Sequence, residues 1–434
     1  MRFFRVGICC LLTFAVLSFG AVEEWSQAVL EVGAASLLVA WAIQLYRLKA
    51  EQLSIPPEFL PLCGFALVVL VELIFHLTAS RYYTRIELQV LIAYLIVVFL
   101  TSQAFTRKEH WRAFVWFLMT LGFFVSIFGI LQHLTFNGKL YWFRVMRFGG
   151  MPFGPYVNRN HFAGFAEMVI PVALVPLVLG KVRRERLFLV ALFALVPLVA
   201  LLLSASRGGI ISFAVQMVIL FSLLVIRRVR SKYLIVGGVV VLSAVMAVSW
   251  IGVNQVLARF TGMQNLEVSP SKRAAMRHDT WRLFLDHPIL GTGLGTLEMV
   301  YPPYDSVYDG KVVNHAHNDY LEGLAETGII GGIFCLWFLG VLLLNALKGM
   351  EGLGESFGSV MNLSGLVACS GILVHSLVDF NLRIPANALL FLVSAHMATV
   401  RLQSANPIAT GVGNGQSHRR RRRKHPSGRG GQTV

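Results

Sequence analysis

Charged side chains are scarce in this 434-residue sequence, because Asp, Glu, Lys and Arg make up only 14% of it. A soluble domain carries roughly 25% charged residues. Hydrophobic residues make up 56%, and the mean hydropathy is +0.66. So little polar surface cannot coat a globule of this size, which excludes a soluble enzyme and a disordered chain. The composition predicts an all-α, polytopic integral membrane protein.

Cysteine is also scarce, and no pair of cysteines has the CxxC spacing or the Cys/His spacing of a metal site. The five cysteines all lie in apolar runs, where a thiol behaves as a small hydrophobic group: Cys9, Cys10, Cys63, Cys335 and Cys369. The polar loops contain no DxD motif and no compact carboxylate cluster of the kind that binds magnesium. We therefore expect no disulfide framework, no metal ion and no cofactor.

Long apolar runs are what the sequence does contain, and a membrane span needs about 20 such residues. Twelve spans are predicted, at residues 5–21, 26–46, 57–77, 86–105, 112–133, 161–180, 187–204, 208–226, 233–253, 323–347, 358–378 and 385–401. The first run also resembles a signal peptide, because Arg2 and Arg5 precede it. Phe19 is bulky for a cleavage site, so the sequence leaves open whether residues 1–21 are removed.

The formal net charge is +16, and the basic residues are distributed unevenly between the two sides of the predicted membrane region. Most of the 38 Lys and Arg residues fall on one side of the membrane if both termini are cytoplasmic, as the positive-inside rule requires. The basic run 419–424 is interpreted as a topological anchor that contacts anionic lipid. Nucleic-acid binding is the less favoured interpretation, since no aromatic residues interleave this run.

Three regions follow from this pattern. Residues 1–133 form N-terminal transmembrane helices, residues 134–401 form a second membrane region, and residues 402–434 form a basic, disordered cytoplasmic tail. The second region contains two long outer loops, 134–160 and 254–322. The latter is long enough to indicate a function, and it contains a predicted helix over 274–290.

A glycine-rich stretch, Gly291-Thr-Gly293-Leu-Gly295, follows that helix. A dinucleotide-binding fingerprint needs a preceding strand and a βαβ unit, and neither is present here. We therefore interpret this stretch as a tight turn.

Polar residues gather where the tenth predicted span begins. His317, Tyr320, Leu321, Leu324, Gly328 and Gly331 follow steps of three and four residues, so a helix from His317 onward would place them on one face. A single interfacial histidine would be unremarkable in this position, but His317 has polar neighbours on both sides: Asn314, His315, Asn318 and Asp319. This cluster is a candidate site.

Ionisable residues also occur inside predicted spans: Glu72 with His76, Glu167, and His375 with Asp379. The first and last pairs have i, i+4 spacing, which places each pair on one helical face. Such residues either serve a function or lock helices together, and the sequence leaves both possibilities open.

Two arginines stand out on the outer side. Arg207, in SASRGG, lies at an outer boundary where the positive-inside bias disfavours it, although it could simply extend to the interface. Arg277 precedes Trp281 by one helical turn in the long loop, where it is either a solvated surface charge or a ligand for an anion.

These motifs together resemble the O-antigen ligase family, which includes the related O-antigen polymerases. His317-Asn318, nine intervening residues and then Gly328-Ile-Ile-Gly331 are similar to the signature of this family. Four further blocks match in order, at residues 154–164, 204–209, 277–297 and 375–391, so the resemblance extends over about residues 145–395.

The resemblance implies a GT-C-like helical fold in the bacterial inner membrane. The donor would be a glycan on undecaprenyl diphosphate, presented at the periplasmic face. The acceptor would be lipid A-core in a ligase and another lipid-linked repeat unit in a polymerase. The essential histidine of the family corresponds to His317, and its arginines to Arg207 and Arg277, the latter with Arg273 and Arg282 as neighbours. The residues expected to bind substrate are Asn318, His315, Asn158, Asn160, Arg282 and Asp379.

This assignment fits the chemistry of the residues. A histidine side chain can accept the proton of an attacking sugar hydroxyl near neutral pH. The forked, permanently charged guanidinium of arginine suits a departing diphosphate. We therefore expect a metal-independent, inverting displacement, with His317 as the base and with Arg207 and Arg277 holding the diphosphate.

Two further classes of function remain open. A transporter of bicarbonate or another small anion could use the ionisable pairs within the spans, although no inverted repeat of broken helices is apparent. A non-catalytic assembly protein would tolerate the simultaneous loss of Arg207, Arg277 and His317. The sequence also does not distinguish a ligase from a polymerase.

Overall fold

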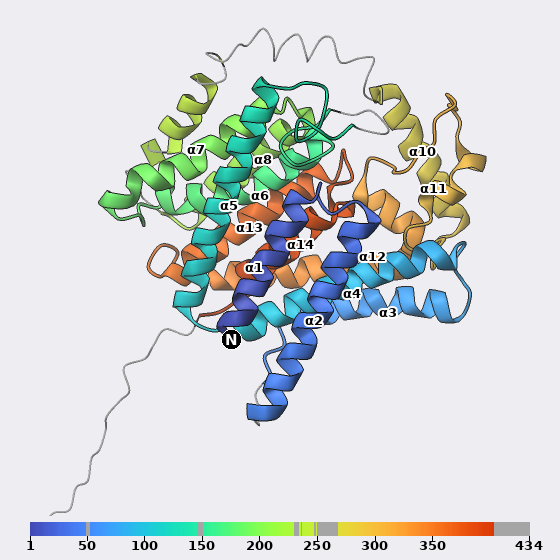
Figure 1. The fold of residues 1–434 in the computed structure, drawn as a ribbon, viewed down its shortest axis with the longest axis horizontal. Coiled ribbons are helices and arrows are strands. Elements are labelled where there is room, and N and C mark those ends of the chain that lie inside the picture. The colour runs from blue at the N-terminus through green and yellow to red at the C-terminus, as the bar shows by residue number, and fades with distance from the viewer. Residues whose placement is uncertain are drawn as a thin grey trace, which may run out of the picture. The chain divides into compact units, whose positions relative to one another are not determined.

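The computed structural model describes residues 1–48, 53–145, 151–229, 234–235, 237–246, 249 and 268–402. These residues form helices and no β-strand, which confirms the all-α prediction for the part described. The helices (Figure 1) are α1 (Arg2–Leu17), α2 (Glu24–Leu48), α3 (Phe59–Ile74), α4 (Arg81–Ala104), α5 (Lys108–Leu134), α6 (Arg159–Val178), η1 (Arg184–Arg186), α7 (Leu187–Leu203), α8 (Arg207–Ile226), α10 (Pro270–Asp286), α11 (Leu297–Val300), η3 (Pro302–Tyr304), α12 (Asp319–Gly349), α13 (Phe357–His375), η4 (Asn381–Arg383) and α14 (Pro385–Thr399).

Eight of the described helices are long and apolar enough to cross a membrane: α2, α4, α5, α6, α7 together with η1, α8, α12 and α13. Three further predicted spans coincide with shorter helices, α1, α3 and α14. The predicted span 233–253 is described only in part, chiefly as a short apolar helix over Gly237–Met246. The protein is thus a polytopic membrane protein with eight candidate spans among the residues that the structure describes, and the count of twelve is not confirmed.

The shortest of these helices, α14, is the centre of the fold. All fifteen of its residues are buried, and it packs against α1, α4, α6, α12 and α13 (Figure 1). A helix of fifteen residues is ~22 Å long, which is less than the ~30 Å of a bilayer core. Neighbouring helices surround α14, so it does not need to match the membrane in length. A run of apolar residues cannot reveal this difference between a lipid-facing helix and a central one.

Hydrogen bonds between helix ends define one end of the bundle, here called the site end. The starts of α6, α8, α12 and α14 and the end of α13 meet there. The amide of Asp319 donates to the carbonyl of Ser376 at 3.0 Å, which joins α12 to α13. The amide of Ala386 donates to the carbonyl of Gly20 at 3.0 Å, which joins α14 to the segment after α1.

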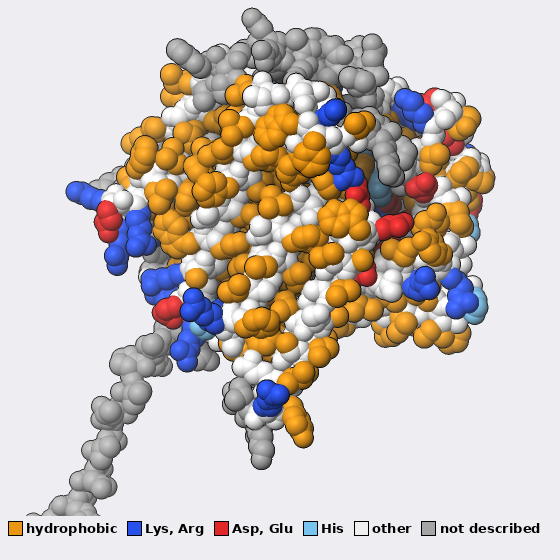
Figure 2. Space-filling view, in the orientation of Figure 1, with side chains coloured by type: hydrophobic (Ala, Val, Ile, Leu, Met, Phe, Trp, Pro, Cys, Tyr) orange, Lys and Arg blue, Asp and Glu red, His pale blue; other side chains and the backbone are white. Residues whose placement is uncertain are grey.

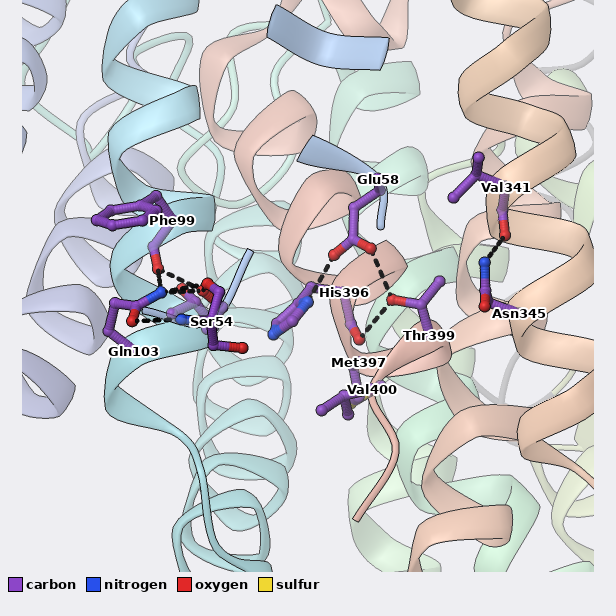
Figure 3. Close-up of polar contacts among 12 residues, drawn as sticks. Ser54, Glu58, Phe99, Gln103, Val341, Asn345, His396, Met397, Thr399 and Val400 are labelled. Carbon is purple, nitrogen blue, oxygen red and sulfur yellow. Dashed lines mark hydrogen bonds and ion pairs between the residues drawn. The ribbon is translucent and has the colours of Figure 1, made fainter. Parts of the chain in front are cut away.

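The opposite end of the bundle is held by buried polar contacts. Glu58, just before α3, pairs with His396 and accepts a hydrogen bond from Thr399 at 2.9 Å, and both partners lie on α14 (Figure 3). Arg227, just after α8, donates to the carbonyl of Leu347 on α12 at 2.7 Å. Glu58 and His396 are almost fully buried, so the loss of either partner would leave the other buried and uncompensated.

The described part of the long loop, from residue 268 onward, packs with the start of α12 around a small core. This core consists of Met276, Leu283, Phe284, Leu297, Tyr301, Val313, Ala316 and Ala325. Asp279 is fully buried there and accepts hydrogen bonds from the Tyr301 hydroxyl and from the amide and hydroxyl of Ser306. Burial would raise the pKa of Asp279, but these hydrogen bonds lower it below its usual value. The expected helix over 274–290 is shifted, since α10 covers Pro270–Asp286 and ends two residues before Pro288, which disfavours a preceding helical residue.

The helix predicted to start at His317 also differs. Asn318 caps α12, which starts at Asp319, and His317 precedes it with a left-handed φ of 51°. Gly328 interrupts α12, with φ 61° and ψ −168°, a region open essentially to glycine alone. The residues from His317 to Gly331 therefore do not form one continuous helical face.

The interruption at Gly328 is where the glycine-rich stretch docks. The amide of Gly293 donates to the carbonyl of Glu326 at 2.8 Å, and the amide of Ile329 donates to the carbonyl of Pro288 at 2.8 Å. A Cβ atom on Gly328 would lie 2.1 Å from the carbonyl oxygen of Ile289. The glycines thus allow two backbone segments to meet, which is a packing role.

Gly328→Ala is expected to destabilise the protein by ~2 kcal/mol or more, because the backbone conformation is strained for alanine and its methyl group would overlap Ile289. Gly323→Ala is the matched control, since Gly323 is helical and an added Cβ would meet nothing within 4 Å. Thermal unfolding in detergent and limited proteolysis of the outer loop measure both effects. Equal stability of the two variants would contradict the docking role.

Candidate functional site

His317 and Asp379 form a nearly buried pair at the site end. Nδ1 of His317 lies 3.2 Å from Oδ1 of Asp379, and the two side chains are 12% and 1% exposed. Burial would raise the pKa of Asp379, but the hydrogen bond and charge of His317 and the neighbouring histidines hold it well below its usual range. A carboxylate at Nδ1 fixes the orientation of the ring and leaves Nε2 to act on a substrate.

The start of α6 supports Asp379 from the other side. Asn158 caps this helix and accepts a hydrogen bond from the amide of Asn160. The side-chain amide of Asn160 then donates to Oδ2 of Asp379 at 2.6 Å, while the amide of Phe380 donates to Oδ1 at 3.0 Å. Asn160 therefore positions Asp379, and Asn158 positions Asn160 through its helix cap.

Phe380 lies among three imidazoles. Its ring stacks on His315 with centroids 4.1 Å apart, and it meets His161 and His317 edge to face at 4.8 Å and 5.1 Å. A rigid apolar wall beside His317 restricts its rotation, since aromatic pairs prefer these geometries.

Beneath Phe380 lies a buried ionic network. Arg383 pairs with Glu326, and its Nε lies 3.1 Å from Oε1 of Glu322. Nδ1 of His315 lies 2.8 Å from Oε1 of Glu322. Burial would lower the pKa of His315, but the charge of Glu322 raises it above its usual value. Glu326 also accepts the amide of Leu297 at 3.0 Å, so the network connects η4, α12 and the outer loop. His315 is thus already engaged by a protein carboxylate.

The segment between His375 and Phe380 also contacts the start of α8. Arg207 is exposed there, next to Gly208 and Gly209. A Cβ atom on Gly208 would lie 2.7 Å from Nε2 of His375 and 3.2 Å from Val378. This close approach places the backbone of Arg207 beside the segment that carries Asp379.

The outer helix α10 reaches the same segment through Arg273. Its Nη1 donates to the carbonyl of Val378, adjacent to Asp379, at 3.3 Å. Arg277, one turn further along the same helical face, is half-buried and has no ion-pair partner among the residues described. Arg282 is exposed five residues further on, which places it on a different face. Helices α8 and α10, which carry Arg207 and Arg277, therefore contact residues 375–378, and His317, just before α12, contacts Asp379.

Several expected contacts differ in the structure. Glu72 is buried whereas His76 is exposed and lies beyond the end of α3, so they are not on one helical face. His375 and Asp379 do not pair with each other. His375 lies 2.9 Å from Glu167, and Asp379 pairs with His317, because α13 ends at His375 and the chain turns before Asp379.

Asn318, expected to bind substrate, has structural partners. Its side chain accepts the amide of Leu321 as the cap of α12 and donates to the carbonyl of Leu377 at 3.1 Å. Within the described ranges, no group of three or more His, Cys, Asp and Glu side chains is arranged to hold a metal ion.

Sequence reasoning missed two arginines at this end of the fold. Arg159 is buried at the start of α6, and Arg383 bridges two carboxylates. Arg273, named from the sequence only as a neighbour of Arg277, contacts the carbonyl of Val378. Arg159 and Arg383 lie inside the blocks 154–164 and 375–391, so the sequence motifs already indicated that these two positions belong to the regions of the family resemblance. Their burial could not be read from those motifs.

The described residues thus form a helical membrane bundle with a histidine–carboxylate pair and arginine-bearing helices at one end. Guanidinium groups in such a position are suited to an anionic substrate. Comparison with known families agrees. Residues 190–336, about a third of the chain, match the model of the O-antigen ligase family. The match supports the assignment of the chain to that family, and hence a membrane glycosyltransferase of the ligase or polymerase type. No curated protein matches the sequence.

The matched segment contains Arg207, Arg277 and His317 and ends before Asp379. The pairing of His317 with Asp379 thus extends the site into a part of the chain that the family model does not cover.

Proposed function

We propose that this protein transfers a glycan from undecaprenyl diphosphate to a sugar hydroxyl of an acceptor at the periplasmic face, as an O-antigen ligase does. The observation that carries the proposal is the His317–Asp379 pair at the end where α6, α8, α12 and α13 meet. An imidazole oriented by a carboxylate is suited to accept a proton from a hydroxyl.

The reaction is a single displacement. As Nε2 of His317 takes the proton of the acceptor hydroxyl, the hydroxyl oxygen bonds to the anomeric carbon. The bond between that carbon and the diphosphate oxygen breaks, and the lipid diphosphate leaves with the electron pair. Attack opposite the leaving group inverts the anomeric configuration.

Arg207 and Arg277 hold the diphosphate in this proposal. Their helices, α8 and α10, approach the 375–380 segment, and guanidinium groups stabilise the negative charge that grows on the leaving oxygen. The residues that touch substrate are then His317, Arg207 and Arg277. Asp379 and Asn160 are positioning residues, and the substrate roles expected for His315, Asn158, Asn318 and Arg282 are secondary.

Purified protein in proteoliposomes, supplied with lipid-linked glycan and lipid A-core, tests the proposal. We expect glycosylated lipid A-core with the intact protein and none with a triple variant, Arg207→Gln, Arg277→Gln and His317→Ala. A triple variant at exposed arginines away from this site, Arg47→Gln, Arg184→Gln and Arg228→Gln, is the control. Full activity of the first triple variant would support a scaffold instead.

The same proteoliposomes distinguish a ligase from a polymerase and from a transporter. Longer lipid-linked glycan formed without lipid A-core would identify a polymerase. Bicarbonate flux in vesicles that contain no lipid-linked glycan would identify a transporter. Loss of activity in chelator, restored only by a divalent cation, would contradict the metal-independent displacement.

A further inference from the structure

A groove lies at the opposite end of the bundle, between α5, α6, α7 and α13. Its cavity volume is about 600 Å³. Five basic residues line it, namely Lys108, Arg112, Lys181, Arg183 and Arg186, together with one acidic residue, Glu355. In Figure 2, Lys and Arg side chains gather along one edge of the molecule beside a largely hydrophobic surface. The groove therefore carries a strong positive charge.

Aromatic rings hold two of these cations. The guanidinium carbon of Arg112 lies 5.4 Å from the ring centroid of Phe357, and that of Arg186 lies 5.5 Å from the ring centroid of Trp116. Stacking on a ring face leaves the donor edges of a guanidinium available to an anion. Among the described residues, no carboxylate pairs with Lys108, Arg112, Lys181 or Arg186. Arg183 has only a loose contact with Glu185, at 3.9 Å.

The lining changes from basic to apolar along two of the walls. On α5 it passes from Lys108 and Arg112 through Trp116 to Met119. Eleven residues of helix rise ~16 Å, which is about half the ~30 Å thickness of a bilayer core. The groove thus has the depth of one lipid leaflet, with its positive charge at the membrane surface.

The wall formed by η1 and α7 repeats this gradient, because Arg186 at the end of η1 is followed one turn deeper by apolar Val190 on α7. Helices α6 and α13 add Val172, Pro176, Val360 and Met361 to the groove, together with polar Ser364. A free phosphate would use only the basic rim. A phospholipid would use both the rim, for its headgroup, and the apolar walls, for an acyl chain.

We propose that this groove binds an anionic phospholipid whose headgroup carries two phosphates, of the cardiolipin type, in the leaflet opposite the His317 end. The excess of basic over acidic lining residues exceeds the charge of a single phosphate, and basic pockets between transmembrane helices suit such headgroups. This lipid site is separate from the glycan-transfer site and does not rest on the proposed function.

Native mass spectrometry of the full-length protein, titrated with cardiolipin, phosphatidylglycerol or phosphatidylethanolamine, tests the proposal. The test variant carries Arg112→Gln, Lys181→Gln and Arg186→Gln. The control variant loses the same charge at exposed basic residues outside the groove, through Arg47→Gln, Arg184→Gln and Arg228→Gln. We expect the test variant to bind cardiolipin at least ~10-fold more weakly than the control variant. Equal affinities of the two variants would overturn the proposal.

The lipid series and a competitor examine the ligand itself. We expect cardiolipin to bind more tightly than phosphatidylglycerol, and phosphatidylethanolamine to bind weakest. Equal binding of cardiolipin and phosphatidylglycerol would overturn the two-phosphate headgroup. Displacement of cardiolipin by millimolar inorganic pyrophosphate would overturn the lipid assignment in favour of a free-anion site.

A second measurement reports on the apolar walls. Cardiolipin with brominated acyl chains is expected to quench the fluorescence of Trp116, taken as the difference between the unmodified protein and Trp116→Phe. Absence of this difference would place the acyl chains outside the groove and contradict the proposal.

Discussion

His317→Ala is expected to lower glycan transfer by ~100-fold to 10,000-fold, because it removes the group proposed to take the proton of the acceptor hydroxyl. His278→Ala is the matched control, since the side chain of His278 is 70% exposed on the outer helix α10. Turnover at saturating donor and acceptor, in protein of equal membrane abundance, is the measurement. Full turnover by the His317 variant would remove the base from the mechanism.

Asp379→Asn distinguishes positioning from proton transfer. The carboxylate accepts from His317 and the Phe380 amide on Oδ1 and from Asn160 on Oδ2. An asparagine has one acceptor oxygen, so either His317 or Asn160 would face its NH₂ group. We expect turnover to fall strongly with little change in the KM for the acceptor. Glu298→Gln, which removes an equal charge from an exposed residue, is expected to leave turnover unchanged.

Arg383→Met is expected to give the largest loss of stability, ~3–5 kcal/mol. Arg383 bridges Glu322 and Glu326, both 1% exposed, and its loss would leave two buried carboxylates without their cation. Burial would lower the pKa of Arg383, but the facing carboxylates raise it further above its usual value. Thermal unfolding in detergent measures the loss, and Arg282→Met, at an exposed position, is the control.

A rescue experiment separates this ionic network from simple packing. Arg383→Met combined with Glu322→Gln and Glu326→Gln removes the uncompensated charges, so stability is expected to recover in part. A triple variant as unstable as Arg383→Met alone would show that the arginine acts through packing and not through charge.

The class of the protein could be predicted from the sequence because hydropathy depends on local composition. Every predicted span with described residues coincides with a helix, although α14 is a central helix and α1 and α3 are short. Arg207, Arg277 and His317 were recognised because their motifs are local. Their approach to one segment near Asp379 depends on contacts between residues far apart in the chain, such as Arg273 and Val378, which are 105 positions apart.

Pairing of charged residues was decided by tertiary structure alone. The i, i+4 spacing favoured Glu72 with His76 and His375 with Asp379, yet both pairs lie where a helix ends. Packing and capping determine the residue at which a helix ends. A side chain beyond that residue no longer lies on the face that the helical spacing predicts. His317 therefore meets Asp379, and His375 meets Glu167, across helices that no local pattern connects.

By itself, the sequence determined that this chain is a helical membrane protein with polar residues concentrated in two long loops, because burial of apolar runs in lipid is set by composition. Only the tertiary structure decided which groups face each other. A buried ion or hydrogen bond is stable only with a partner at the correct distance, and that distance is fixed by how α6, α8, α12 and α13 pack around α14.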